Sequence, residues 1–219
     1  MNRENKMGTM PVARLLITMS LPMILSMLVQ ALYNVVDSIF IARFSKDALA
    51  AVSYAFPAQN LMIGLATGIG VGMNALLSKS LGEKNHENVK KSAENGIFLA
   101  LIGFVIFFIF GLFFAGPFIA FQTKTASVIA YGKSYLMICC CASFGIFGEI
   151  IFERLMQSTG KTIFTLATQG VGAVINIILD PILIFGWFGL PALGIAGAAL
   201  ATVIGQIVAF IIAVILNHK

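Results

Sequence analysis

The length, composition and charge of this sequence place it in a membrane. Its 219 residues are 59% hydrophobic and only 11% charged, whereas a soluble domain carries roughly 25% charged residues. This deficit excludes an ordinary soluble enzyme. The net charge of +5 does not indicate nucleic-acid binding, because the basic residues fall in short loops where they orient a membrane chain.

Six long apolar segments follow one another along the chain. One stretch, residues 97–115, has no charged, amide or hydroxyl side chain. A helix of about 20 apolar residues crosses a hydrocarbon core of ~30 Å, and backbone groups in lipid must be paired within the segment. We therefore predict an all-α membrane protein, a bundle of six transmembrane helices. They run near 13–42, 48–78, 93–121, 126–156, 160–187 and 193–216, and the longest linker between them is expected at 81–94.

Lysine and arginine are shared unevenly between the two sides of this bundle. Ten of them lie on the side of the N-terminus and four on the other side. Because basic residues are retained in the cytoplasm, we expect both termini to be cytoplasmic. Trp187, Phe188, Tyr131 and Tyr135 then fall near the outer interface, where aromatic rings are favoured. The cytoplasmic set is Arg3, Lys6, Arg14, Lys79, Lys84, Lys90, Lys91, Arg154, Lys161 and Lys219.

Rows of small residues mark two of the helices. Gly64, Gly68 and Gly72 recur every four residues in the second helix, and a similar row begins at Gly197 in the sixth. Such rows let helix backbones approach closely in lipid. We expect both rows to be helix-packing faces.

A polar stripe runs along the first predicted helix. Gln30, Asn34 and Asp37 are spaced so that they share one face, with Tyr33 beside them. An aspartate at a helix centre costs roughly 2.5–3.5 kcal/mol on insertion scales, so it is expected to face a cavity or a partner. The alternative is that Asp37 sits at the outer interface close to Arg43.

The fifth predicted helix has a second stripe. Asn176 and Asp180 are one turn apart, and Gln169 lies on the same face two turns earlier. Pro181 follows the aspartate and frees the carbonyl of Ile177, which bends the helix. The freed carbonyl, the carboxylate and the carboxamide together suit a small cation, and the carboxylate can also bind a proton. The alternative is that the kink is purely structural and that the aspartate has hydrogen-bond partners within the protein.

Weaker polar signals occur in the sixth and second helices. Thr202 and Gln206 are one turn apart in the sixth helix. Asn60 belongs to a set of four polar residues that recur every seven positions from Ser53 to Asn74. These side chains either line water or serve as hydrogen-bonding contacts between helices.

The fourth predicted helix ends with two acids, Glu149 and Glu153, at a spacing of one turn. Counted from Gly160, Glu153 lies roughly 10 Å inside the helix end. It is either an interfacial partner of Arg154 or a buried proton acceptor near the cytoplasmic mouth.

No enzyme motif is present, and no metal site or cofactor is predicted. The sequence contains no H-E-x-x-H, no Walker loop and no nucleophile elbow. The three cysteines, 139–141, are consecutive in one apolar stretch and have no histidine at ligand spacing. We interpret them as packing residues.

Three segments together resemble the multidrug and toxic compound extrusion (MATE) family. They are VQALYNVVDSIFIARF at 29–44, FERLMQSTGKT at 152–162 and INIILDPILIFGWFGLPALGIAGAALATVIGQ at 175–206. The similarity covers nearly the whole chain and is greatest to the MepA-like bacterial drug exporters. It implies a multi-pass protein of the bacterial inner (plasma) membrane that exports drugs and other organic cations.

The resemblance also implies roles for particular residues. Family members exchange H⁺ or Na⁺ for organic cations by rocking two six-helix lobes. Their cation site corresponds to Asp37 and Asp180, with Asn176 and Thr202 beside it, and a further acid corresponds to Glu153. The substrate cavity is expected to include Gln30, Asn34, Tyr33, Asn60, Gln169 and Gln206, and the coupling ion, H⁺ or Na⁺, is expected to bind at Asp37, Asp180 and Asn176.

The chain resembles the first, second, fifth and sixth helices of the family, so the resemblance places the chain in the N-terminal lobe, and the sequence ends just after its sixth predicted helix. A second six-helix lobe is expected, either in a longer chain or from a homodimer partner. We hypothesise that ion binding bends the first or fifth helix near Pro22 or Pro181. The alternatives are a lipid-linked oligosaccharide flippase, which would line its cavity with Arg or Lys, and a non-transporting scaffold or assembly fragment, in which Asp37 and Asp180 lie apart or at the interface.

Overall fold

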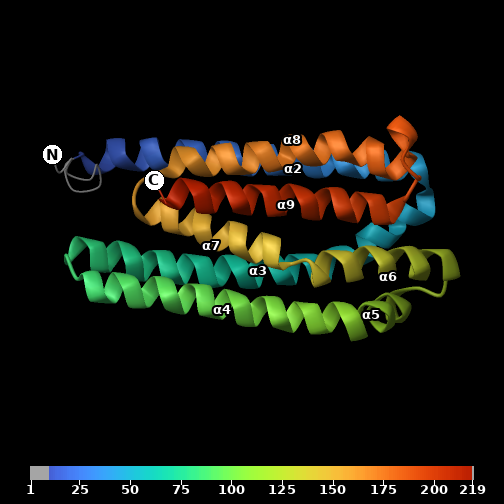
Figure 1. Ribbon diagram of the computed structural model, residues 1–219, viewed down its shortest axis with the longest axis horizontal. Helices are drawn as coiled ribbons and strands as arrows, with labels where there is room; N and C mark the ends of the chain where they lie inside the picture. Colours follow the sequence, from blue (N-terminus) through green and yellow to red (C-terminus); the bar gives the residue numbers. More distant parts are fainter. Residues whose placement is uncertain (1–9, 219) are drawn as a thin grey trace.

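The computed structural model describes residues 10–218, which form a bundle of long helices aligned along one direction (Figure 1). Arg3, Lys6 and Lys219 lie outside these described residues. Within the described residues, five helices are each long and apolar enough to cross a membrane, and α6 and α7 meet the same criterion only when taken together as a bent pair, so there are five to six candidate spans. The predicted all-α membrane bundle is confirmed. Its elements are α2 (Val12–Phe44), α3 (Lys46–Gly82), α4 (His86–Phe113), α5 (Ala115–Gln122), α6 (Ala126–Cys141), α7 (Phe144–Ser158), α8 (Thr162–Phe185), the 3-10 turn η1 (Trp187–Gly189) and α9 (Ile195–His218).

The helices form two groups that meet at α9. On one side α2 packs chiefly on α8, and α8 packs on α9. On the other side α3 packs on α4, α6 and α7, and both α6 and α7 reach α9. Figure 1 shows α2 and α8 along one edge of the bundle and α4 along the opposite edge. Because α2 has little contact with α3, space remains between the two groups for a cavity.

Two of the predicted helices are interrupted. The segment expected at 93–121 is divided at Phe114 into α4 and α5, because Pro117 has no N–H and its ring would clash with the preceding turn. The segment expected at 126–156 breaks at Ala142 and Ser143, and α6 and α7 meet there at 46°. Ser143 and Gly145 stand at this break, and such Ser/Gly pairs are common sites of helix kinks.

The linker expected at 81–94 is mostly helical. Only 83–85 lie between α3 and α4. Asn85 accepts a hydrogen bond from the backbone N–H of Asn88 and so caps α4. Lys91 and Glu87 are 2.6 Å apart, one turn from each other along α4. The helices therefore continue beyond the apolar core as polar, ion-paired ends.

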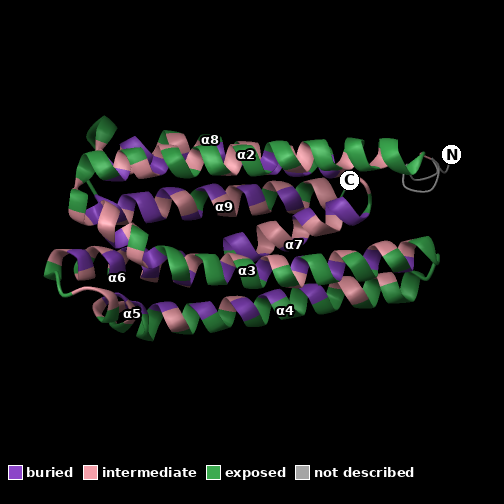
Figure 2. Ribbon diagram, turned by 180° about the vertical axis from the view of Figure 1, so that it is seen from behind, coloured by how far each residue is buried: buried purple, intermediate pink, exposed green. Residues whose placement is uncertain are grey.

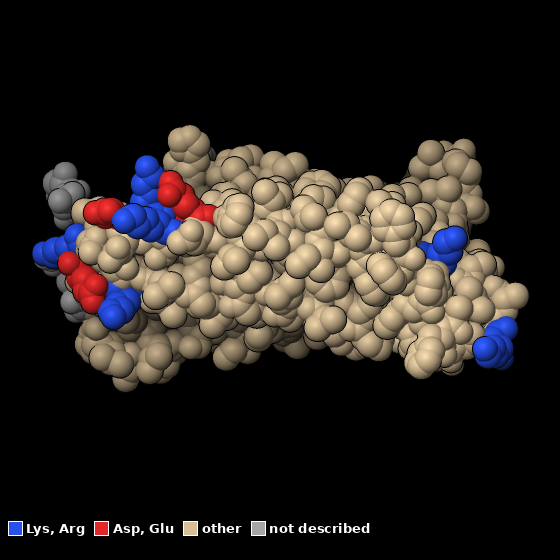
Figure 3. All heavy atoms as spheres, turned by 90° about the horizontal axis from the view of Figure 1, so that it is seen from below, with Lys and Arg blue, Asp and Glu red and all other residues tan. Residues whose placement is uncertain are grey.

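The surface has the charge distribution of a membrane-spanning bundle. On the face shown in Figure 3, charged side chains gather at the two ends and leave an uncharged band between them. Helix α2 is exposed over most of its length (Figure 2). Its only buried residues are Ser26, Asp37 and Ile41. A long apolar helix with so little burial faces lipid or another membrane segment.

The two glycine rows differ in their surroundings. A Cβ added at Gly197 would press on the carbonyl of Leu183, and one at Gly205 would lie 2.8 Å from the carbonyl oxygen of Gly172. This row brings α9 against the backbone of α8, as expected. A Cβ added at the α3 glycines 64, 68 or 72 would meet nothing within 4 Å. The expectation that the α3 row packs on a neighbouring helix is therefore wrong for the part of the chain described.

Candidate ion and substrate site

Two buried aspartates face each other where α2 packs on α8. Asp37 is 7% exposed and Asp180 is fully buried. Their carboxyl groups lie close enough to interact electrostatically, and the Oδ1 atom of each has no partner among the described residues. Two adjacent carboxyl groups in low dielectric are not easily ionised together. The pair can therefore share a proton or hold a small cation.

Asn176 and Thr202 complete this cluster from α8 and α9. In the orientation that satisfies both ends of its carboxamide, Asn176 Nδ2 donates to Asp180 Oδ2 at 3.3 Å. Its oxygen then accepts from the Thr202 hydroxyl at 3.2 Å and from the Thr202 N–H at 3.1 Å. Asn176 therefore links Asp180 to α9 and holds the carboxyl group in place.

A cavity of about 330 Å³ opens beside the aspartate pair and is lined by α2, α3, α6 and α9. Asp37 lines it, so the carboxyl group faces polar space and not lipid. The ion pairs among the described residues do not include Asp37, so the structure does not show the alternative pairing with Arg43. The polar side chains proposed for the substrate cavity that line this space are Gln30, Tyr33, Asn34, Asn60 and Gln206.

Gln59 and Tyr135 also line this cavity, and the sequence reasoning missed both. The Tyr135 side chain is only 3% exposed, and Gln59 Nε2 lies 3.5 Å from its hydroxyl oxygen. Tyr135 therefore faces the inside of the bundle and does not point outward as an interfacial ring would.

A second acidic cluster lies in the C-terminal half of α7. Glu153 is 4% exposed and accepts hydrogen bonds from the Thr168 hydroxyl at 2.6 Å and from Gln169 Nε2 at 3.0 Å. The Arg154 guanidinium donates instead to Gln157 Oε1 at 2.6 Å. Of the two alternatives for Glu153, the structure shows the buried acid and not the ion pair with Arg154.

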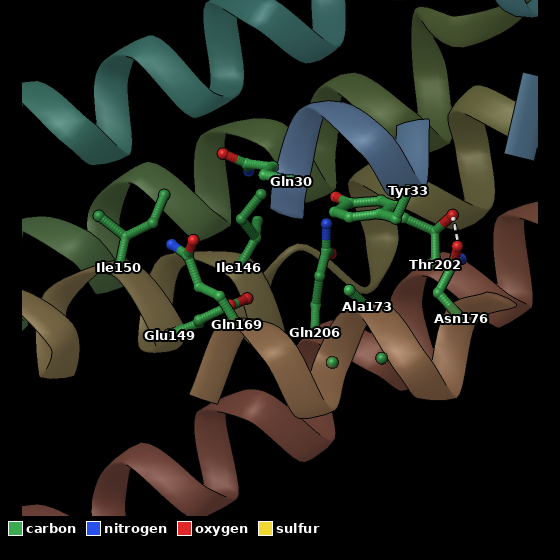
Figure 4. A pocket seen from close by; sticks show the side chains of 12 residues that line it. Gln30, Tyr33, Ile146, Glu149, Ile150, Gln169, Ala173, Asn176, Thr202 and Gln206 are labelled. Carbon is green, nitrogen blue, oxygen red and sulfur yellow. Dashed lines mark hydrogen bonds between the residues drawn. The ribbon is translucent and has the colours of Figure 1, made fainter. Parts of the chain in front are cut away.

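A smaller cavity of about 40 Å³ lies between the two acidic clusters (Figure 4). Gln169, predicted for the substrate cavity, lines this space and not the larger one. The side chains of Gln30, Tyr33, Thr202 and Gln206 line both cavities. The two polar spaces are therefore neighbours that share a wall.

The two prolines proposed as hinges lie inside continuous helices. Helix α2 runs through Pro22, whose carbonyl accepts from the Ser26 hydroxyl at 2.9 Å. Helix α8 runs through Pro181, directly after Asp180. Each proline removes one backbone hydrogen bond from its helix, which leaves both helices with a local point of weakness.

Comparison with known proteins assigns the chain to a family. The family model described as MatE matches residues 22–182. The chain belongs to the MATE family. This family comprises membrane transporters and not enzymes.

Three curated MATE-related proteins match over most of this chain. The probable multidrug resistance protein YoeA of Bacillus subtilis is 32% identical over 199 residues, 90% of this chain and 43% of that protein. The FAD transporter of Shewanella oneidensis is 28% identical over 212 residues, 95% of this chain and 47% of that protein. The multidrug export protein MepA of Staphylococcus aureus is 27% identical over 211 residues, 95% of this chain and 46% of that protein.

Solved MATE structures share this fold. A MOP superfamily transporter from Pyrococcus furiosus superposes with a TM-score of 0.84 at 26% identity, over 91% of this chain and 43% of that one. A crystal structure of MATE in the bent conformation gives a TM-score of 0.82 at 27% identity, over 92% of this chain and 44% of that one. The MATE chain described here thus spans about half the length of the relatives it matches.

The hydrogen bonds around Glu153 lead to a stability prediction. Replacing Glu153 with leucine leaves the part-buried Gln169 Nε2 without its acceptor, so we expect the free energy of unfolding to fall by about 1–3 kcal/mol. Glu153→Gln keeps an acceptor oxygen on a side chain of similar shape. Its free energy of unfolding is expected to fall by less than half as much as that of the leucine variant. Thermal unfolding of the purified protein in detergent measures both, and an equal loss in the two variants would contradict this role for the acceptor.

Proposed function

We propose that this MATE chain is part of an antiporter that exports organic cations in exchange for H⁺ or Na⁺ across a bacterial plasma membrane. The supporting observation is the buried pair of Asp37 and Asp180, each with an unpartnered oxygen, beside a cavity between the two helix groups. Binding of the coupling ion neutralises this pair, and its departure leaves negative charge that attracts an organic cation.

The lining of the cavity favours a cationic substrate. Neither the 330 Å³ cavity nor its smaller neighbour has a Lys or Arg among its described lining residues. A pyrophosphate-linked lipid or a flavin dinucleotide needs such side chains for its phosphates. The aromatic Tyr33, Phe56 and Tyr135 in the larger cavity instead suit the flat, charged rings of organic cations. These features argue against the flippase alternative and against a substrate like that of the Shewanella relative.

The placement of the two aspartates also argues against a non-transporting scaffold. That alternative requires the carboxyl groups to lie apart or among lipid headgroups, and here they are buried and adjacent. Burial of two adjacent acids is costly. Buried acids are therefore expected more often where they bind an ion than where they only fill space.

The oxygen atoms of the cluster are the proposed ligands of the coupling ion. The Asp37 and Asp180 carboxylates and the Asn176 carboxamide are hard oxygen donors, which suit Na⁺, and the carboxylates also bind H⁺. We propose that ion binding changes the curvature of α2 or α8 at Pro22 or Pro181 and so reshapes the cavity wall. Thr202 positions Asn176 through their hydrogen bond.

We further propose that the chain is the N-terminal lobe and acts with a second six-helix lobe, either in a longer chain or from a homodimer partner. Alternating access needs two units that rock about a central site. The exposed apolar length of α2 and the open glycine row of α3 provide surfaces for such a partner. In this arrangement both termini are cytoplasmic.

A flux experiment tests this function. The protein expressed from its complete reading frame is reconstituted into vesicles loaded with a fluorescent organic cation, and an opposing H⁺ or Na⁺ gradient is imposed. We expect export of the cation to follow one of the two gradients, and external FAD not to compete. Cation flux that ignores both gradients, or flux of FAD in its place, would contradict the proposal.

A further inference from the structure

Glu149 is a half-buried acid to which the proposed antiport assigns no role. It lies on α7, one turn before Glu153, and lines the 40 Å³ cavity. Residues one turn apart on a helix have neighbouring side chains, so Glu149 lies next to the Glu153 cluster. Figure 4 shows its side chain entering the cavity from α7 beside that of Gln169 from α8.

The same cavity reaches the aspartate cluster at its other end. Asn176 and Thr202 line it, and Asn176 is the residue that donates to Asp180. Tyr33 lines both this cavity and the larger one that contains Asp37. The small cavity therefore lies between the two acidic clusters and is bounded by side chains that contact each of them.

The cavity has room and polar partners for water. A water molecule needs roughly 10–15 Å³ of such space and two to four polar partners, and the cavity offers about 40 Å³. Its polar walls include Glu149, Gln206 and Gln169. The Oε1 atom of Gln169 is buried without a partner among the described residues, while its Nε2 donates to Glu153. Gln169 thus has one free acceptor and also contacts the second acid.

No basic side chain neutralises Glu149 in the described part of the chain. The cavity lining contains no Lys, Arg or His, and Arg154 donates to Gln157. The titratable groups that face Glu149 are Glu153 from its own helix and Tyr33 from α2; the facing polar groups on α8 and α9 are amides and a hydroxyl. A proton is therefore the simplest neutralising ligand.

We propose that Glu149 is a proton-binding site that links the Asp37–Asp180 pair to Glu153, so that this lobe contains a proton path that adjoins the substrate cavity and leads away from it. This inference rests on the proposed antiport and specifies H⁺ as the ion that uses the path. The aspartate pair gives its proton to a water molecule in the larger cavity, which Asp37 lines. That water gives a proton to a second water molecule in the small cavity across the wall that the two cavities share, and the second water gives a proton to the Glu149 carboxylate. Glu149 then passes its proton to Glu153 near the cytoplasmic end. Each step breaks one O–H bond and forms another, so charge and atoms balance.

The test compares Glu149→Gln with the exposed-acid control Glu83→Gln in the protein expressed from its complete reading frame. Glutamine has the same shape as glutamate but cannot accept and release a proton. We expect Glu149→Gln to slow H⁺-driven export of the organic cation by about tenfold or more and to leave equilibrium binding of that cation unchanged. Infrared spectra without any drug provide a second measurement: a pH-dependent carboxylic acid band should be lost in Glu149→Gln and kept in Glu83→Gln.

The outcomes separate this inference from the proposed function. Normal H⁺-driven export by Glu149→Gln, together with failure of the Asp37→Asn variant, would overturn the path and leave the antiport intact. Weaker drug binding by Glu149→Gln would make Glu149 a substrate ligand and also overturn the path. If the wild type shows no exchange, the proposed function fails, and the infrared band still decides whether Glu149 binds a proton. If Glu149→Gln does not fold, Glu149→Asp, which keeps the acid, is expected to retain the band.

Discussion

Substitution of Asp37 or Asp180 by asparagine is expected to abolish the coupling of export to the ion gradient. Asparagine keeps the size of the side chain and can hydrogen-bond to the remaining aspartate, but it takes up no proton and has no negative charge to balance a bound cation. The variant therefore resembles the neutralised site permanently. We expect ion-driven export of the organic cation to slow by about 100-fold or more, and drug binding to lose its dependence on pH or Na⁺.

The matched control for these variants is Glu94→Gln. Glu94 is an exposed acid on α4, 3.7 Å from Lys90, so its neutralisation changes the same charge at a place far from the cavity. Surface pairs of this kind contribute little to stability. Export of the organic cation by the aspartate variants and by the control is measured in vesicles of the same composition, with the ion gradient imposed in each direction. Ion-driven export at the wild-type rate in either aspartate variant would contradict the proposed coupling site.

Substitution of Gly197 by alanine is expected to destabilise the whole bundle. The added methyl group would press on the carbonyl of Leu183 and lie 2.9 Å from the backbone nitrogen of Ile184. Because these are backbone atoms, no side chain can rotate away, and α9 must move off α8. Overpacking of this kind costs about 1–3 kcal/mol. We expect a lower midpoint of thermal unfolding in detergent and a lower yield of folded protein.

Gly68→Ala is the control for this prediction, because it adds the same methyl group to a helix glycine with nothing within 4 Å. Alanine has the higher helix propensity by up to about 1 kcal/mol. The control is therefore expected to be as stable as the wild type or slightly more stable in assays of folding. Equal unfolding midpoints for the two variants would show that α8 and α9 do not approach as closely as the structure indicates.

The polar stripes could be predicted from sequence because the cost of placing polar groups in lipid is local. Asp37, Asn176 and Asp180 stand out in apolar helices, and each had to face a cavity or partner. Helical spacing also showed which residues share a face. It does not show which helix lies opposite, so the hydrogen bond between Asn176 and Thr202 became visible only in the structure.

The missed features depend on contacts between segments far apart in sequence. Tyr135 was placed at the interface because aromatic residues gather there, but its helix packs on α3 and brings its hydroxyl to Gln59. The break between α6 and α7 contains no proline and gave no strong signal. The small residues of α3 and α9 both recur every four positions, with Ala201 between the two α9 glycines, yet only the α9 row has a neighbouring backbone. Spacing identifies a surface suited to close approach and does not identify what approaches it.

The open glycines of α3 affect how easily a neighbouring helix could slide. Side chains that interlock between two helices must separate before either helix can shift, and that separation raises the barrier to motion. Glycines have no side chains that could interlock with a neighbour. A helix from the second lobe would therefore contact backbone atoms here, mainly through weak Cα–H···O interactions. Movement along this row would break few contacts at a time. Helix α3 therefore offers a surface along which a second lobe could slide with little resistance, whereas α8 and α9 pack tightly beside Asn176 and would keep the proposed ion site in place.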